Sequence, residues 1–213
     1  MSSTDHAAPT DHAAWADHAA AVLENDRVRL TPITEADREG VRAVAMDPAI
    51  WRYFVAAVET EADFESFFDV NLADHAAGRR AVYVITDKKG GRIAGSMSFG
   101  NMAEADRRLE IGWSWLGRDF RGRGVNHWAK ALLLTHAFEV LGVERAEFKT
   151  DVLNVQARRG LANIGATEEG TLRSYNFMPG GRRRDAVFYS VLRAEWPAVR
   201  EALARGPKKA VPA

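Results

Sequence analysis

A glycine-rich basic turn that runs directly into a helix is the feature that most constrains this sequence. The turn extends from Arg118 to Gly124, and from Val125 to Val140 apolar residues recur every three or four positions, the period of a helix. Strand-forming residues at 109–116 precede the turn. Such a helix start offers unpaired amide N–H groups at the positive end of the helix dipole, here beside three arginines. The stretch therefore predicts a site for a phosphate-bearing ligand.

The glycine spacing distinguishes this turn from two other nucleotide sites. The NTPase loop Gly-x-x-x-x-Gly-Lys-Ser/Thr is absent, and Gly122-Arg-Gly124 is not followed by the third glycine of a dinucleotide fingerprint. What remains is Arg121-x-x-Gly124-x-Asn126, which resembles the acetyl-CoA pyrophosphate loop of the GNAT N-acetyltransferase superfamily. Asn126 departs from that family's usual glycine or alanine, and with the Ala-Lys that follows it resembles a sub-branch related to ribosomal-protein N-terminal acetyltransferases. The alternative is a structural turn with its arginines in solvent.

The bulk properties exclude several classes of protein. The 213 residues carry a formal net charge of zero, so the chain as a whole has no electrostatic attraction for nucleic acid or an anionic membrane. Cysteine is absent, which excludes disulfides, a thiol nucleophile and cysteine-ligated zinc. No apolar run has membrane-spanning length, and we find no histidine and glutamate spacing suited to a metal. We expect a cytoplasmic protein without a metal.

The N-terminal segment differs in composition from the rest of the chain. Asp-His-Ala-Ala occurs three times at a six-residue period within residues 1–20. The histidines could form a metal tract, but a six-residue period does not align them on one helix face, and an Ala-rich flexible tail is the favoured interpretation. We expect a tail over 1–22, one acetyltransferase domain over 23–205 and a short tail over 206–213. On this view, a truncation that begins at Ala21 leaves the domain intact.

The order of predicted elements indicates an α/β fold. Strand patterns alternate with helical patterns, several of them preceded by capping residues or ended by glycine. The strands are predicted at 27–32, 80–85, 92–99, 108–116, 145–150, 167–175 and 185–192, and the helices at 34–46, 60–78, 125–141, 154–164 and 195–203. This order resembles the GNAT fold from about residue 27 to 200. The resemblance implies a single domain with a mixed, mostly antiparallel sheet, splayed at the cofactor strand and flanked by helices on both faces.

The resemblance also implies acetyl-CoA as cofactor, with coenzyme A as product, and the residues that hold it. In the family, pantetheine pairs with the exposed backbone of the strand before the loop, and Gly112 suits a bulge in that strand. An asparagine after the following strand contacts pantetheine, although Asn154 could equally be a helix N-cap. The expected cofactor residues are Trp113, Ser114, Trp115, Leu116, Arg121, Gly122, Arg123, Gly124, Val125, Asn126 and Asn154.

Glu110 is the candidate catalytic residue, because it matches a glutamate common in the sub-branch. A base that accepts the amine's proton would act directly or through water. The alternative is a strand-edge carboxylate paired with an arginine. The positions at which the family often places a proton donor for the leaving thiolate hold Ala157 and Leu161, so the proton source stays open between water, Tyr175 and the amine itself.

The acceptor is expected to be a primary amine, on a protein N-terminus or a small molecule. In the family the segment between the first two helices often walls the acceptor pocket, which makes Trp51 and Tyr53 candidate substrate residues together with Tyr175. Core packing explains these aromatics equally well. An isolated Glu110 would suit an α-amine, whose pKa is near ~8 rather than the ~10.4 of lysine.

Two further functions stay open, an aminoglycoside-type antibiotic N-acetyltransferase and a catalytically silent acyl-CoA-binding protein. The absent proton donor motivates the second. No nucleic-acid or membrane partner is expected, and a homodimer is allowed.

Overall fold

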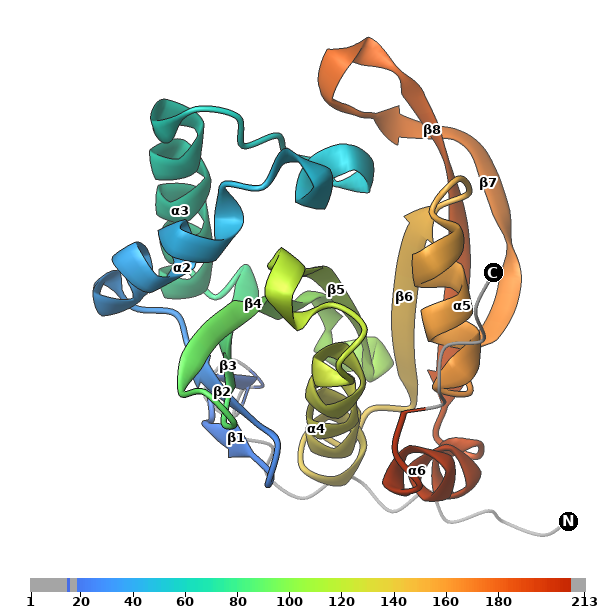
Figure 1. Cartoon of the computed structure of the whole chain (residues 1–213). Helices are drawn as coiled ribbons and strands as arrows, with labels where there is room; N and C mark the ends of the chain where they lie inside the picture. Colours follow the sequence, from blue (N-terminus) through green and yellow to red (C-terminus); the bar gives the residue numbers. More distant parts are fainter. Residues whose placement is uncertain (1–14, 16–18, 208–213) are drawn as a thin grey trace, which may run out of the picture.

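The computed structural model describes residue 15 and residues 19–207, which form one mixed eight-stranded sheet with strand order β1-β2-β3-β4-β5-β6-β8-β7 (Figure 1). Neighbouring strands are antiparallel except β5 and β6, which are parallel. The predicted fold class is confirmed, with the two-residue β1 as an addition. The strands are β1 (Leu23–Glu24), β2 (Val28–Pro32), β3 (Arg80–Asp87), β4 (Arg92–Ala103), β5 (Arg108–Leu116), β6 (Arg145–Asp151), β7 (Thr167–Phe177) and β8 (Arg183–Leu192).

Helices cover the sheet on both faces. One core joins α4 (Val125–Glu139), α5 (Val155–Asn163) and α6 (Trp196–Ala204) to the sheet, and a second core joins α2 (Arg38–Ala45) and α3 (Glu61–Ala76) to its opposite face. Strand β3 shows the division, because Ala81, Tyr83 and Ile85 belong to the first core and Val82 and Val84 to the second. This alternation is what a period of two requires of a strand buried on both faces.

Strand β5 contains a β-bulge that changes the direction of its side chains. The pairing with β4 passes from Ser98↔Gly112 to Ser96↔Trp115, so β5 has one residue more than β4 in this interval. Trp113 lies in it with φ +50, in the left-handed region. An extra residue exchanges the two faces of a strand. Ile111 therefore points into the core under α4, whereas Trp115 points into the opposite core under α2 and α3.

Strands β5 and β6 separate soon after they meet. Their parallel pairing covers Arg108–Glu110 against Arg145–Glu147 only, although β5 continues to Leu116 and β6 to Asp151. In Figure 1 the two ribbons diverge toward the end of the sheet where the β7–β8 hairpin extends. The facing edges of β5 beyond Glu110 and β6 beyond Glu147 therefore do not pair with each other. The expected splay at this strand is present.

The N-terminal boundary lies earlier than expected. Trp15 and Ala19 are buried in the core under α4, with 5% and 0% of their surface exposed. The Tyr83 hydroxyl donates a hydrogen bond to the Ala19 carbonyl. A tail that ends at residue 22 is thus wrong for these two residues, and a truncation that begins at Ala21 would remove packed side chains. The remaining repeat residues lie outside the described residues, except for Ala20.

We predict that Trp15→Ala lowers the free energy of unfolding by about 3 kcal/mol, because it removes a large buried aromatic side chain and leaves a cavity. Urea denaturation followed by circular dichroism measures the change. Val22→Ala is the matched control, since Val22 is 51% exposed and its truncation should cost less than about 0.5 kcal/mol. An equal, small effect of both substitutions would contradict the packing role of Trp15.

Candidate active site

The turn before α4 presents an array of backbone amide groups. Residues Arg118–Phe120 form a short 3-10 helix, and Gly122 and Gly124 follow with φ values of +72 and +83. Glycine adopts these left-handed angles without strain, which allows the chain to turn sharply into α4. Among the described residues, no acceptor is found for the N–H groups of residues 122–127. Such an array at a helix start suits a phosphate group.

The arginines of this turn have different surroundings. Arg121 donates from Nε to the Leu116 carbonyl at 3.0 Å and approaches Asp47 at 4.0 Å, so its side chain fastens the turn to β5. Arg118 and Arg123 are exposed and have no ion pair within the described part of the chain. Arg118 and Arg123 are therefore unengaged by the described residues, whereas Arg121 is held at Nε, and its role toward an anion stays a prediction.

The edge of β5 beyond Glu110 is the second part of the site. Trp113 and Ser114 form the bulge and have no register partner on β4, and no residue of this segment pairs with β6. The Trp115 side chain is buried against Trp51, with ring centroids 5.5 Å apart, so only its backbone faces this edge. An extended ligand with amide groups could pair with these backbone groups as a strand does.

Glu110 lies where β5 and β6 separate, and it is not isolated. The residue is 5% exposed, and its Oε2 accepts hydrogen bonds from Asn101 Nδ2 at 2.7 Å and from Lys149 Nζ at 2.8 Å. The expectation of an unpartnered glutamate is wrong, and the expected alternative partner, an arginine, is replaced by a lysine. The parallel register explains the contact, because Glu110 pairs with Glu147 and Lys149 lies two residues further along β6 on the same face.

The second carboxylate oxygen of Glu110 has a different environment. Oε1 has no hydrogen-bond partner among the described residues and lies over Gly112, where a Cβ atom would come within 2.8 Å of it. Gly112 itself has no positive φ. The bulge expected at Gly112 occurs instead at Trp113, and Gly112 provides room for the carboxylate. The arrangement holds Oε2 with two donors and leaves Oε1 free to accept a proton.

Aromatic and basic side chains surround Glu110. Lys149 Nζ lies 5.8 Å from the centroid of the Trp113 ring and 5.7 Å from that of Tyr175. The Arg80 guanidinium lies 5.0 Å from the Trp113 ring. Gly100 is required beneath Trp113, because a Cβ there would come within 2.4 Å of the indole. Lys149 thus contacts both Glu110 and the ring of Tyr175, and the role of Tyr175 toward a substrate stays a prediction.

The other predicted substrate residues lie apart from this group. Trp51 is 5% exposed, packs against Phe67 and donates from Nε1 to the Ala45 carbonyl at 2.9 Å, so it belongs to the core under α2 and α3. Tyr53 is half-buried and lies under Arg52. Neither is in direct contact with Glu110, and their role toward a substrate stays a prediction.

The two asparagines that were predicted to bind the cofactor form hydrogen bonds with nearby residues of the chain. Asn154 caps α5, since its Oδ1 accepts from the Ala157 N–H at 3.1 Å. Asn126 Oδ1 accepts from Lys130 Nζ at 2.8 Å. Burial lowers the pKa of Lys130 to about 8. Both amide nitrogens stay available to a ligand, because each bond uses the oxygen only.

Lys149 and Asn101 contact Glu110, and sequence reasoning missed both. For Lys149 the alternation Glu-x-Lys-x-Asp in β6 was the signal that could have found it, since it places one lysine among acids on a single strand face. For Asn101 no local pattern indicated a role.

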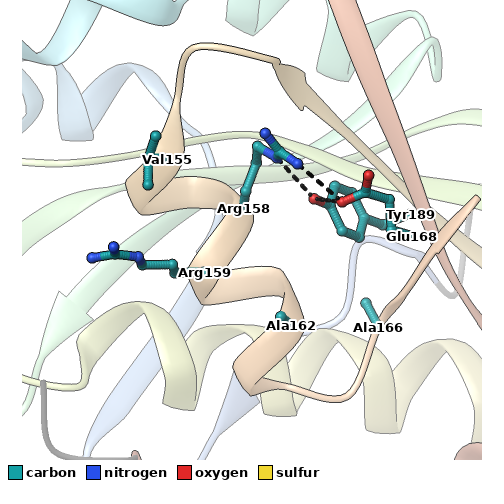
Figure 2. Close-up of a pocket in the computed structure, with 7 residues that line it drawn as sticks. All are labelled: Val155, Arg158, Arg159, Ala162, Ala166, Glu168 and Tyr189. Atoms are coloured by element: carbon teal, nitrogen blue, oxygen red, sulfur yellow. Dashed lines mark hydrogen bonds and ion pairs between the residues drawn. The ribbon is translucent and has the colours of Figure 1, made fainter. Parts of the chain in front are cut away.

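A pocket lies elsewhere, between α5, β7 and β8 (Figure 2). Figure 2 shows Arg158 directed at Tyr189 and Glu168, and these three side chains bond one another at 2.6 to 3.3 Å. Because Arg158, Glu168 and Tyr189 satisfy one another, this side of the pocket has the character of a structural junction, whereas Arg159 in Figure 2 is not joined to them. Among the described residues no cluster of histidine, aspartate and glutamate could hold a metal ion, and no helix has the length and apolarity to cross a membrane.

A sheet that opens beside a helix start, with unpaired strand edges and a carboxylate at the point of opening, suits an extended ligand that carries phosphate groups. The chain belongs to the acetyltransferase (GNAT) domain family, whose model matches residues 27–167, and it is an acetyltransferase. Acetyl-CoA is the donor expected for this family.

Individual relatives support the same assignment. The chain is 35% identical over 106 residues to YdaF of Bacillus subtilis, provisionally named a ribosomal N-acetyltransferase, an alignment that covers 50% of this chain and 57% of YdaF. A crystal structure of an acetyltransferase from T. thermophilus, also provisionally named, superposes with a TM-score of 0.78 at 35% identity, covering 86% of this chain and 95% of that one. RimJ of Mycobacterium smegmatis, solved with CoA-disulfide, has the same fold, with a TM-score of 0.75 at 23% identity over 88% of this chain and 95% of its own.

We predict that Arg123→Ala weakens acetyl-CoA binding by roughly three- to tenfold, because an exposed charge-assisted contact to phosphate is lost. Isothermal titration calorimetry measures the affinity. Arg173→Ala is the matched control, since Arg173 is exposed on β7 and its loss should leave the affinity unchanged. If the two substitutions have equal effects, the turn before α4 is not the phosphate site.

Proposed function

We propose that the protein transfers an acetyl group from acetyl-CoA to a primary amine by direct attack of the amine on the thioester. The amide groups of residues 122–127, with Arg118 and Arg123, would hold the diphosphate of the cofactor. The unpaired edge of β5 at residues 111–116 would hold its pantetheine arm. Bound acetyl-CoA supplies the activated acetyl group.

The observation that carries this proposal is the orientation of Glu110. Two donors fix Oε2, so the carboxylate cannot rotate freely, and Oε1 lies over Gly112 without a partner among the described residues and is not one of the fully enclosed unpaired atoms. A positioned carboxylate in this place can accept the proton that an amine loses when it attacks. Lys149 keeps the carboxylate oriented and balances its charge in a buried site.

Glu110→Gln should lower kcat by roughly 10²–10⁴ near pH 7, because glutamine keeps the shape and the hydrogen bonds but cannot accept the proton. Acetyl-CoA affinity should stay within twofold of the wild type. Raising the pH should restore much of the rate, since more of the amine is then already neutral. Thiol release from acetyl-CoA measures kcat between pH 6.5 and 9.5. A defect independent of pH would show that Glu110 positions the amine instead of deprotonating it.

Gly112→Ala tests the position of Oε1 without changing any titratable group. The added methyl would lie 2.8 Å from Oε1, so this oxygen must leave its present position. We expect kcat to fall at least tenfold, with a similar melting temperature. Gly160→Ala is the control, because nothing lies within 4 Å of a Cβ at that position of α5. Normal activity of Gly112→Ala would contradict the proposed role of Oε1.

A further inference from the structure

Arg184 is a buried arginine without a carboxylate partner. It lies on β8 beyond the end of β6 and is 5% exposed. Its Nε donates to Asn176 Oδ1 at 2.9 Å, and this is the side-chain hydrogen bond that the described residues provide for it. Its two terminal nitrogens have no partner there, yet they are absent from the fully enclosed unpaired atoms, so they reach solvent-accessible space. Burial lowers the pKa of Arg184 from its ordinary value.

The charged groups around Arg184 include the candidate base Glu110. The electrostatic neighbours of Arg184 are Asp151, Glu110, Tyr175 and Arg182. The two acids are already engaged: Lys149 pairs with Glu110, and Arg182 pairs with the fully buried Asp151. The three basic side chains Lys149, Arg182 and Arg184 thus lie near only two acidic side chains of the described residues, Glu110 and Asp151. Arg184 supplies the excess positive charge.

An uncompensated buried charge is costly unless a partner arrives from outside the chain. An arginine with four free N–H donors fits a carboxylate in two-pronged geometry. We propose that Arg184 binds a carboxylate of the acetyl acceptor, so that the substrate is an amine that also carries an acidic group. The proposal rests on the proposed function, in which the amine approaches Glu110.

This assignment separates the acceptor classes that the sequence left open. A polycationic amine such as an aminoglycoside would meet Arg184 and Lys149, both positive, and repulsion in a poorly hydrated site disfavours it. A peptide N-terminus followed by an acidic residue, or a free amino acid with its own carboxylate, would neutralise the excess charge. Both sources share the carboxylate, and they differ in its distance from the amine.

The test compares acceptors that differ only in a carboxylate. One set consists of alanyl tetrapeptide amides with glutamine at positions two to four, and of versions with a single glutamate at each of these positions. The second set consists of alanine, serine and glutamate as free amino acids and as their α-amides. Thiol release gives kcat/KM for each compound, and we expect at least a tenfold preference for the carboxylate member of one set. That set identifies the source of the carboxylate.

The variants connect the preference to Arg184. Arg184→Gln should reduce the acid-to-amide ratio to about one while acetyl-CoA affinity stays within twofold, and Arg184→Lys should keep part of the ratio. Arg183→Gln is the matched control, because Arg183 is exposed on the same strand and binds Ser174, so the ratio should not change. If Arg184→Gln fails to fold, the wild-type ratio and Arg184→Lys decide the question.

Binding to the CoA-loaded protein provides a readout independent of turnover. N-acetylated products of both sets are titrated by calorimetry, and the carboxylate product should bind at least tenfold more tightly. If no amine is acetylated but this preference exists, the proposed transferase function fails and the Arg184 site stands. Equal affinity for acid and amide, or a preference for lysine-containing peptides, overturns the Arg184 proposal.

Discussion

The separation of β5 from β6 is the constraint on which the rest of the molecule depends. The bulge at Trp113 turns the end of β5 toward the α2 and α3 core and withdraws its edge from β6. Two strand edges are then unpaired in the middle of a sheet, a place where backbone groups are normally satisfied. Such an opening is tolerable if a ligand pairs with it. The same separation leaves Glu110 at the last paired position of β5. The proposed binding surface and the proposed base therefore both depend on the course of β5.

Local patterns predicted the elements well and the long-range contacts poorly. The strand 108–116, the turn and the helix that follows have the predicted positions, because capping residues, glycines and hydrophobic period are local signals. The role of Gly112 was misjudged because it depends on the conformation of Glu110, two residues earlier. The Glu110–Lys149 pair depends on the register of two strands with a helix between them in the sequence. No single segment contains that information.

The burial of aromatic residues was also difficult to predict from the sequence. Trp51 and Tyr175 are both aromatic residues that were predicted to contact the substrate, yet Trp51 packs into a core and Tyr175 is 42% exposed beside Lys149. Packing is decided by which faces of the sheet are covered, and the bulge at Trp113 sets that for β5. Trp15 is the converse case. A repetitive, alanine-rich segment indicated no core residue, but the groove beside α4 accommodates an indole.

Most of the buried charged side chains near Glu110 have partners within the protein. The Glu110–Lys149 and Asp151–Arg182 pairs are closed within the protein, so their desolvation is offset before any ligand arrives. Arg184 departs from this arrangement: it is as buried as Glu110 but finds only an amide oxygen. A chain selected for stability alone would place a carboxylate or an apolar residue there, since an unpaired buried charge weakens folding. Local departures from such rules concentrate where a protein meets its ligand. The missing partner of Arg184 therefore agrees with the proposal that the substrate supplies the carboxylate.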